Sequence, residues 1–285
     1  MRPWRSVLYI PGSNERALEK ARGLPVDAII FDLEDAVAVD QKAAAREALG
    51  KALRAGGYGD RALMVRINAL DTPWGLEDLD AVGDAGPAAI LLPKVDSAAD
   101  IRKLAERLAL HSGTANTRIW AMMETTRGIF NAAEIALAPR MQGFVLGTND
   151  LAAEIGCRMG ADRMPLMMAL QSCIAAARMG GIACVDGVYN AFKDEAGLRA
   201  ECEQGRDLGM DGKSLIHPAQ VAICNEVFSP SEAEVDLARR QIAAWEEVTT
   251  KGQGVAVVDG QIVENLHVAT ARATLAKHDA AKVTG

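Results

Sequence analysis

Short apolar segments recur along this chain, and a polar or charged side chain stands at the end of nearly every one. Eight of them read as β-strands, at residues 6–10, 28–33, 62–67, 88–92, 118–123, 143–147, 182–185 and 213–216. The polar residues that end or follow them are Asp32, Glu34, Asp35, Arg66, Asn68, Lys94, Glu124, Asn149, Asp150, Asp186 and His217. Because the loops after the strands of a (β/α)₈ barrel share one face, the pattern predicts a TIM barrel with an enzyme site there.

The segments between these strands have the composition of helices. Ala, Leu, Glu, Lys and Arg recur at helical spacing in residues 14–22, 41–55, 76–82, 98–109, 131–138, 166–179 and 194–208. The strands show no clean alternation of apolar and polar residues, which is typical of parallel strands buried on both faces. This rhythm favours one α/β barrel domain.

Composition limits the classes of function. The chain has 285 residues, of which 49% are hydrophobic, enough for one large domain. A net charge of −7 argues against a general nucleic-acid binder. Five cysteines without a C-x-x-C pair predict reduced thiols in a cytoplasmic protein. We expect neither a membrane span nor a signal peptide, because no apolar run is long enough for the first and the N-terminus lacks the pattern of the second.

The alternation of predicted strands and helices ends after residue 228. We therefore expect a catalytic barrel domain at residues 1–228 and a C-terminal extension at 229–285. Ser231 and Glu234 form a capping box for a helix that ends near residue 250. Asp259 and Gly260 predict a hairpin turn, and a last helix is expected at 266–278. The extension is too small to form its own core, so it should pack on the barrel or on a neighbouring subunit.

Glu124 and Asp150 are the most informative pair of side chains. Each follows the end of its strand, and the two strands are consecutive, so a barrel would bring the carboxylates together at its mouth. Carboxylate oxygens without nearby His or Cys suit Mg²⁺. Two adjacent acids would also repel each other unless a cation lay between them. The alternative is an ion pair with a neighbour such as Arg127, and we favour the metal.

Arg66 ends the third strand, and Asp32, Glu34 and Asp35 end the second. The arginine could bind a carboxylate or stabilise a developing enolate oxygen, or it could form a salt bridge to these acids; the roles are compatible. Glu34 and Asp35 could hold metal-bound water. They could equally be acids at a helix N-terminus.

Two weaker signals involve basic residues. Arg16 and Lys20 lie four residues apart on a predicted helix, behind Ser13, and could form a phosphate patch or merely a solvated face. His217 precedes Pro218 at the end of the last strand. A role in the site and a packed structural role are both open for it.

Six motifs in order give the chain a family resemblance. They are LYIPGS at 8–13, FDLEDAV at 31–37, VRIN at 65–68, METTRG at 123–128, GTNDLA at 147–152 and LIHP at 215–218. In these motifs and their spacing the chain resembles the HpcH/HpaI aldolase superfamily, and within it the citrate lyase beta subunit-like CoA-ester lyases. The resemblance covers essentially the whole chain and is specific for the family rather than for the substrate.

The resemblance implies a role for each matching residue. Glu124 and Asp150 match the Mg²⁺ ligands, and Arg66 matches the substrate-binding arginine. The positions that match contacts to the CoA part of the substrate are Tyr9, Arg16, Lys20, Ile216 and His217. Family members are typically homotrimers or larger, such as hexamers, and their C-terminal segment closes over a neighbour's active site.

One departure concerns that segment. In several family members an Asp there is the acid/base that acts across the interface, whereas the matching stretch here carries Glu264. Asp259 precedes the turn glycine and is the weaker candidate. A glutamate is one methylene longer and could still relay a proton, although small positioning errors cost rate.

The expected reaction is therefore a Mg²⁺-dependent retro-Claisen cleavage of a CoA thioester such as malyl-CoA, citramalyl-CoA or a citryl thioester. It would give a 2-oxo acid and acetyl-CoA, with Glu264 as the base and Arg66 stabilising the departing enolate. The alternatives are a malyl-CoA thioesterase on the same site, and a citrate lyase beta subunit that acts on an acyl-carrier-protein thioester. An aldolase for free 2-oxo acids is disfavoured, since these offer nothing for Arg16 and Lys20 to bind.

Overall fold

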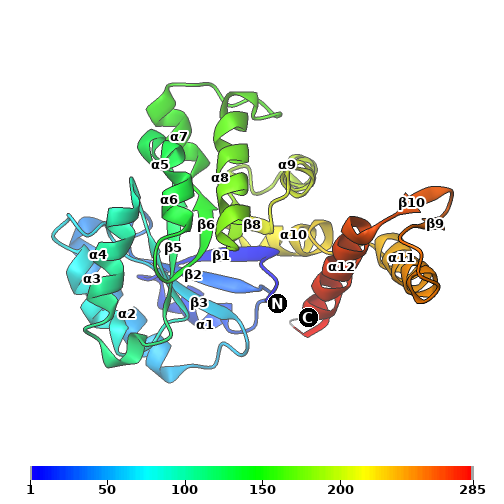
Figure 1. The fold of residues 1–285 in the computed structure, drawn as a ribbon. Helices are drawn as coiled ribbons and strands as arrows, with labels where there is room; N and C mark the ends of the chain where they lie inside the picture. The colour runs from blue at the N-terminus through cyan, green and yellow to red at the C-terminus, as the bar shows by residue number, and fades with distance from the viewer. Residues whose placement is uncertain (1, 284–285) are drawn as a thin grey trace.

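Eight parallel strands form a closed barrel in the computed structural model, which describes residues 2–283 (Figure 1). The strands pair in sequence order, and β8 returns to β1. Their bounds are β1 Ser6–Pro11, β2 Ala28–Asp32, β3 Ala62–Arg66, β4 Ala89–Leu92, β5 Arg118–Met123, β6 Met141–Leu146, β7 Ala183–Asp186 and β8 Gly212–Leu215. The (β/α)₈ fold and all eight predicted strands are confirmed.

Helices surround the barrel. They are α1 Glu15–Ala21, α2 Lys42–Ala55, α3 Gly75–Gly83, α4 Ala98–Leu108, α5 Thr126–Phe130, α6 Ala132–Ala136, α7 Thr148–Ile155, α8 Met167–Gly180, α9 Glu195–Leu208 and α10 Val221–Val227. The prediction missed α5, α7 and α10, which are short and begin within a few residues of a strand end. The segment around Asn131 is split, because Asn131 interrupts the helical backbone between α5 and α6.

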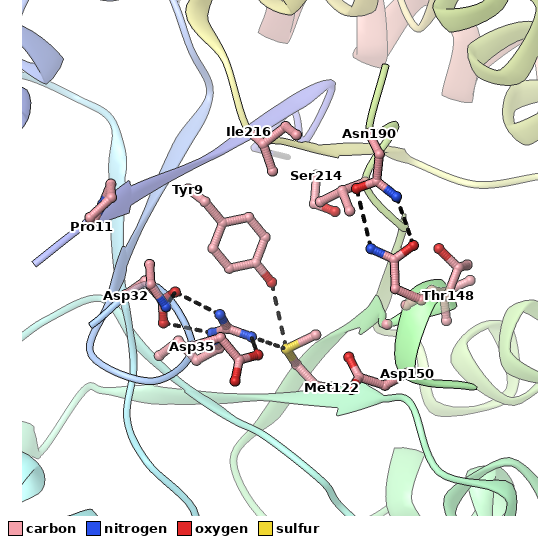
Figure 2. A pocket seen from close by; sticks show the side chains of 16 residues that line it. Tyr9, Pro11, Asp32, Asp35, Met122, Thr148, Asp150, Asn190, Ser214 and Ile216 are labelled. Atoms are coloured by element: carbon pink, nitrogen blue, oxygen red, sulfur yellow. Dashed lines mark hydrogen bonds and ion pairs between the residues drawn. The ribbon is translucent and has the colours of Figure 1, made fainter. Parts of the chain in front are cut away.

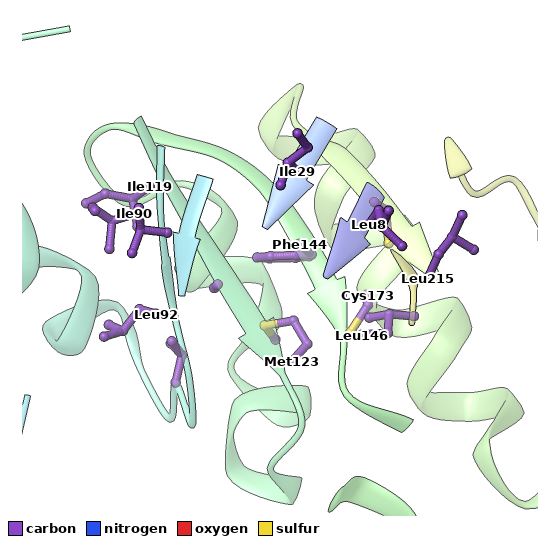
Figure 3. Close-up of a cluster of buried hydrophobic side chains, with 14 of the residues drawn as sticks. Leu8, Ile29, Ile90, Leu92, Ile119, Met123, Phe144, Leu146, Cys173 and Leu215 are labelled. Carbon is purple, nitrogen blue, oxygen red and sulfur yellow. The ribbon is translucent and has the colours of Figure 1, made fainter. Parts of the chain in front are cut away.

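Two apolar layers hold the barrel together. Side chains on the inner face of the strands fill the barrel, among them Ile30, Met64 and Trp120. Alternate residues on the outer face pack against the helices, including Ile29, Ile90 and Phe144 (Figure 3). Gly143 is required beside Trp120, since a Cβ there would lie 2.5 Å from the indole ring. The packed interior forces the polar residues to gather at the barrel mouth.

A buried ionic cluster lies outside the barrel at β7 and β8. Asp186 accepts hydrogen bonds from Arg163 at 2.8 Å and from Lys213 at 3.0 Å, and Lys213 also donates to Glu201 on α9 at 2.6 Å. Burial alone would raise the pKa of Asp186, but the two cations outweigh it and hold that pKa below its ordinary value. Asp186 therefore serves the scaffold, although its place at a strand end suggested a residue of the mouth.

The C-terminal extension consists of α11 Glu232–Thr250, the hairpin β9 Ala256–Val258 and β10 Gln261–Val263, and α12 Asn265–Val283. The predicted capping box and hairpin are confirmed: Ser231 accepts from Glu234 N, and Val258 pairs antiparallel with Gln261. The extension has a small apolar cluster of its own and projects to one side of the barrel (Figure 1). No helix within residues 2–283 is long and apolar enough to cross a membrane.

Candidate active site

A pocket of about 400 Å³ lies at the carboxyl ends of the strands (Figure 2). Its walls come from strand ends and from the residues that follow them, which is where a TIM barrel places its chemistry. The predicted residues that line it are Tyr9, Asp32, Asp35, Arg66, Asn149, Asp150 and Ile216. Met122, Asn190 and Ser214 also line it. The predicted mouth of the barrel thus contains one shared pocket.

Arg66 is buried and surrounded by carboxylates from the end of β2. Its Nη1 lies 2.9 Å from Glu34 Oε2 and 3.4 Å from Asp35 Oδ2, while Nε and Nη2 both donate to Asp32. The guanidinium also lies 5.0 Å from the centre of the Tyr9 ring. The predicted salt bridge is confirmed, and it holds the cation against the pocket wall.

Glu34 is a buried acid with an unusual proton affinity. Burial raises the pKa of Glu34 to about 8, and the neighbouring acids add to the rise while Arg66 opposes it. Its contact with Arg66 lacks hydrogen-bond geometry, so Oε2 accepts no hydrogen bond from the described residues. An acid in this state can hold a proton or a polar ligand at neutral pH.

Glu124 is buried beneath the pocket rather than exposed on its wall. Its Oε1 accepts from the backbone N–H of Lys94 at 2.8 Å, and Lys94 adopts a left-handed backbone (φ 52°) at that point. The pKa of Glu124 is raised to about 7, mainly by burial and in part by the negative charge of Asp150, while the hydrogen bond from Lys94 N–H opposes the rise. Arg127 faces Asp96 at 3.7 Å. The alternative of a Glu124–Arg127 pair is therefore wrong.

The donor set fits a magnesium ion. No three His, Cys, Asp or Glu side chains within residues 2–283 converge as a metal cage. Two carboxylates are what Mg²⁺ needs from a protein, because it keeps several waters and takes further oxygens from its substrate. Gly147 leaves room for this arrangement, since a Cβ there would lie 2.5 Å from Glu124 Oε2. A cation between Glu124 and Asp150 would also relieve their repulsion.

The loops after β6 and β7 meet beside Asp150. Asn190 donates to Asn149 Oδ1 at 2.9 Å, and Asn149 donates back to Asn190 Oδ1 at 3.3 Å (Figure 2). Gly187 allows the approach, because a Cβ at that position would lie 2.4 Å from Thr148 Oγ1. The paired amides are neutral polar groups beside the charged side chain of Asp150.

The residues predicted to contact CoA are only partly brought together. Tyr9 and Ile216 line the pocket, whereas Arg16 and Lys20 are exposed on α1 and do not line it. Asn14, directly after Ser13, is the N-cap of α1, and its side chain accepts from Ala17 N. His217 is exposed, accepts from Ala219 N through Nδ1, and stacks on Phe192 with ring centres 4.7 Å apart.

Other predicted positions lie away from the pocket. Glu264 is exposed on the extension between β10 and α12 and does not line the pocket of its own chain. Asn68 is buried and donates to Leu33 O and Asp78, so it supports the loops behind the pocket.

Sequence reasoning overlooked Met122, Asn190 and Ser214. Met122 carries no charge, yet its Sδ lies 3.5 Å from Tyr9 Oη and 3.6 Å from Arg66 Nη1. Ser214 points into the barrel between two outward residues, and strand alternation could have revealed it. Asn190 lies beyond the end of β7 in a loop with no recognised motif.

The fold, the carboxylate pair and the strand-end motifs together define a family. The chain belongs to the HpcH/HpaI aldolase/citrate lyase family, whose model matches residues 5–218. It is 60% identical to the (3S)-malyl-CoA thioesterase of Cereibacter sphaeroides over 98% of this chain and 95% of that protein. It is 36% identical to citrate lyase subunit beta of Escherichia coli, over 96% and 92% of the two chains.

Solved structures agree with this membership. The structure of CitE from Mycobacterium tuberculosis in complex with magnesium, acetoacetate and coenzyme A has a TM-score of 0.82 and 30% identity, covering 98% of this chain and 100% of that one. The M. tuberculosis citrate lyase beta subunit complexed with oxaloacetate and magnesium has a TM-score of 0.70, 31% identity and coverage of 80% and 98%. Magnesium is thus a cofactor in this family.

Proposed function

We propose that this protein hydrolyses a malyl-CoA-type thioester at a Mg²⁺ site, releasing the free hydroxy diacid and CoA. The observation that carries the proposal is the 60% identity, over 98% of the chain, to proteins named (3S)-malyl-CoA thioesterase. The pocket supports it, because a pair of carboxylates and a buried arginine suit a substrate with a hydroxyl, a carboxylate and a thioester.

The charged side chains of the pocket would have different roles. Glu124 and Asp150 would hold Mg²⁺, which when bound supplies a positive charge that orients the substrate's oxygens and polarises them. Arg66, fixed by Asp32, faces the pocket as a second cation that would bind the substrate's carboxylate. Glu34 and Asp35 lie beside Arg66 and would accept hydrogen bonds from metal-bound water.

The CoA part of the bound substrate would extend out of the pocket past Tyr9, Ile216 and His217. Arg16 and Lys20 lie outside the pocket on α1, where they would meet phosphates rather than the acyl group. The CoA complex of a structural relative supports a CoA thioester as the substrate class.

The assembly would complete the site. Glu264 lies on the extension, away from the pocket of its own chain, so we propose that it enters a neighbour's pocket in a homotrimer or hexamer. There it would take or return a proton as acid/base. A cytoplasmic location stays a prediction.

Carbon–carbon cleavage is the second candidate, because the chain is also 36% identical to citrate lyase subunit beta. In that reaction the hydroxyl proton leaves to a base, the bond between the hydroxyl carbon and its methylene neighbour breaks, and the electron pair passes to the thioester as an enolate. The enolate then takes up a proton, so the products are a 2-oxo acid and acetyl-CoA. The same likeness keeps an acyl-carrier-protein thioester as a further substrate to test.

Product analysis separates these candidates. Purified protein is incubated with malyl-CoA and with citramalyl-CoA, with Mg²⁺ or with EDTA, and free thiol and 2-oxo acid are measured separately. The proposal expects free CoA without oxo acid, lost in EDTA. Oxo acid without free CoA would contradict the hydrolase and indicate the lyase. Activity only on the acyl-carrier-protein thioester would indicate the beta-subunit role.

A further inference from the structure

The side chains of Asn149 and Asn190 form a hydrogen-bond donor set beside Asp150. Each side-chain amide uses one N–H and one carbonyl lone pair on the other, at 2.9 and 3.3 Å. An amide has two N–H donors and a carbonyl oxygen with two lone pairs. Asn149 and Asn190 therefore each keep one N–H available, and both side chains line the pocket.

The surrounding loop holds Asn190 in place. Gln220 donates to Tyr189 O at 2.9 Å, and Tyr189 Oη donates to Asp194 at 2.7 Å. The carbonyl of Asn190 itself accepts from Phe192 N at 2.9 Å. The donor thus sits on an anchored segment, and anchoring is what makes a donor effective when charge develops.

The charges around the pocket indicate what these donors would meet. Anionic groups of the substrate would be drawn to Arg66 and to a cation on Glu124 and Asp150. A thioester carbonyl is uncharged in the ground state, so it has no such partner and suits neutral N–H donors. Asn190 and Ser214 lie on the same side of the pocket, across from Asp32 (Figure 2).

We propose that Asn149 and Asn190 donate hydrogen bonds to the thioester carbonyl oxygen and stabilise the negative charge that forms on it. In hydrolysis the oxygen of water bonds to the thioester carbon, and the π-electron pair of the C=O bond moves onto the carbonyl oxygen. That pair then re-forms the C=O bond as the C–S bond breaks, the C–S electron pair leaves on sulfur, and a proton lost by water ends on the thiolate. This inference rests on the proposed function, but it holds for the enolate of carbon–carbon cleavage too, because the same oxygen becomes negative.

Two substitutions at one position test the donor. N190D keeps the acceptor for Asn149 and loses the donor, while N190A removes both without adding charge. Loss of one such donor lowers kcat by about 10²–10³-fold. We expect kcat on malyl-CoA to fall by about 10²-fold in both variants. In N190A, which adds no charge beside Asp150, KM, Mg²⁺ affinity by calorimetry and thermal stability should stay close to those of the wild type. N116D, which adds a charge at an exposed site before β5 at the other end of the barrel, is the matched control.

A carbonyl-free probe distinguishes a donor from a residue that only shapes the pocket. In S-(3-carboxy-3-hydroxypropyl)-CoA the thioester carbonyl is a methylene, so the wild type and N190A should bind it within twofold of each other. Unchanged kcat in N190A, or a parallel loss of affinity for this thioether, would overturn the proposal. A wild-type protein that converts no malyl thioester would overturn the proposed function first, and with it this inference.

Discussion

Arg66 holds Asp32 through two charge-assisted hydrogen bonds, from Nε to Oδ1 at 2.7 Å and from Nη2 to Oδ2 at 2.6 Å. Both side chains are buried, and the pair joins the ends of β2 and β3. The bidentate contact fixes the plane of the guanidinium, so only Nη1 is left to face the other groups of the pocket. The position of this cation is therefore set by an acid that need not touch the substrate.

Breaking this pair should destabilise the protein. D32N removes the charge that accepts both bidentate hydrogen bonds from the buried guanidinium, and breaking a buried ion pair costs about 3–5 kcal/mol in comparable cases. D35N should cost less than about 1 kcal/mol, because Asp35 is exposed and its contact is longer. Urea unfolding of both variants measures the difference; equal effects would show that the bidentate geometry is unimportant.

Removing either candidate metal ligand should abolish Mg²⁺ binding. E124Q and D150N each leave one carboxylate, and we expect both to lose the Mg²⁺-induced rise in melting temperature and the Mg²⁺-dependent turnover. E154Q is the matched control, since Glu154 lies one turn beyond Asp150 on α7 and bonds to Thr126. Wild-type Mg²⁺ affinity in E124Q would place the metal elsewhere.

Gly147 offers a test that removes no ligand. The Cβ of G147A would lie 2.4 Å from Glu124 Cβ and 2.5 Å from its Oε2, so the carboxylate must shift. Overpacking of this kind costs about 1–3 kcal/mol, and Mg²⁺ affinity should fall although both acids remain. G160A, where a Cβ would come no closer than 3.3 Å to Asp162, should change neither quantity. Calorimetric titration with Mg²⁺ decides, and unchanged affinity in G147A would count against Glu124 as a ligand.

Acid should unfold the protein partly through Asp186. Lys213 and Arg163 outweigh the effect of burial and lower the pKa of Asp186 in the folded state. The stabilisation is therefore fully present above the unfolded pKa of about 3.9 and is lost as pH falls through the lower folded value. Denaturant unfolding from pH 3 to 7 should show that D186N is less stable at neutral pH and that its free energy of unfolding falls less steeply as the pH is lowered. The same fall in both proteins would contradict this role.

Complementation tests the proposed role of Glu264. E264Q and E124Q should each be inactive alone, because one lacks the acid/base and the other a metal ligand. If Glu264 serves a neighbour's pocket, mixed oligomers formed after partial unfolding and reassembly should regain a measurable fraction of activity. Full activity of E264Q, or no recovery in the mixture, would remove Glu264 from the mechanism.

The sequence was most informative where chemistry and periodicity coincide. The positions of Asp32, Arg66, Glu124 and Asp150 at the mouth could be predicted, because a charged side chain that follows a buried strand of a barrel usually lies there. The direction in which a strand-end side chain points could not be predicted. Asp186 faces the outer helices, where it meets Lys213, its register partner on β8, which also points outward. That contact joins residues 27 apart in the chain, and no local pattern encodes it.

The place of Asn190 in the pocket could not be predicted from the sequence for a related reason. Asn190 acquires its role only when its loop meets Asn149, 41 residues earlier in the chain. Arg16 and Lys20 show the opposite error, since helical spacing placed them correctly on one exposed helix but said nothing about their distance from the pocket. Local patterns predict elements, whereas a site depends on how loops from different strands approach one another.

Isotope transfer tests the central claim, Mg²⁺-dependent thioester hydrolysis, most directly. The protein is incubated with (3S)-malyl-CoA in H₂¹⁸O with Mg²⁺, and the masses of the products are measured by mass spectrometry. We expect malate with one ¹⁸O in the newly formed carboxylate, equimolar free CoA, and neither product in EDTA. Glyoxylate and acetyl-CoA without labelled malate would contradict the hydrolase and establish carbon–carbon cleavage in its place.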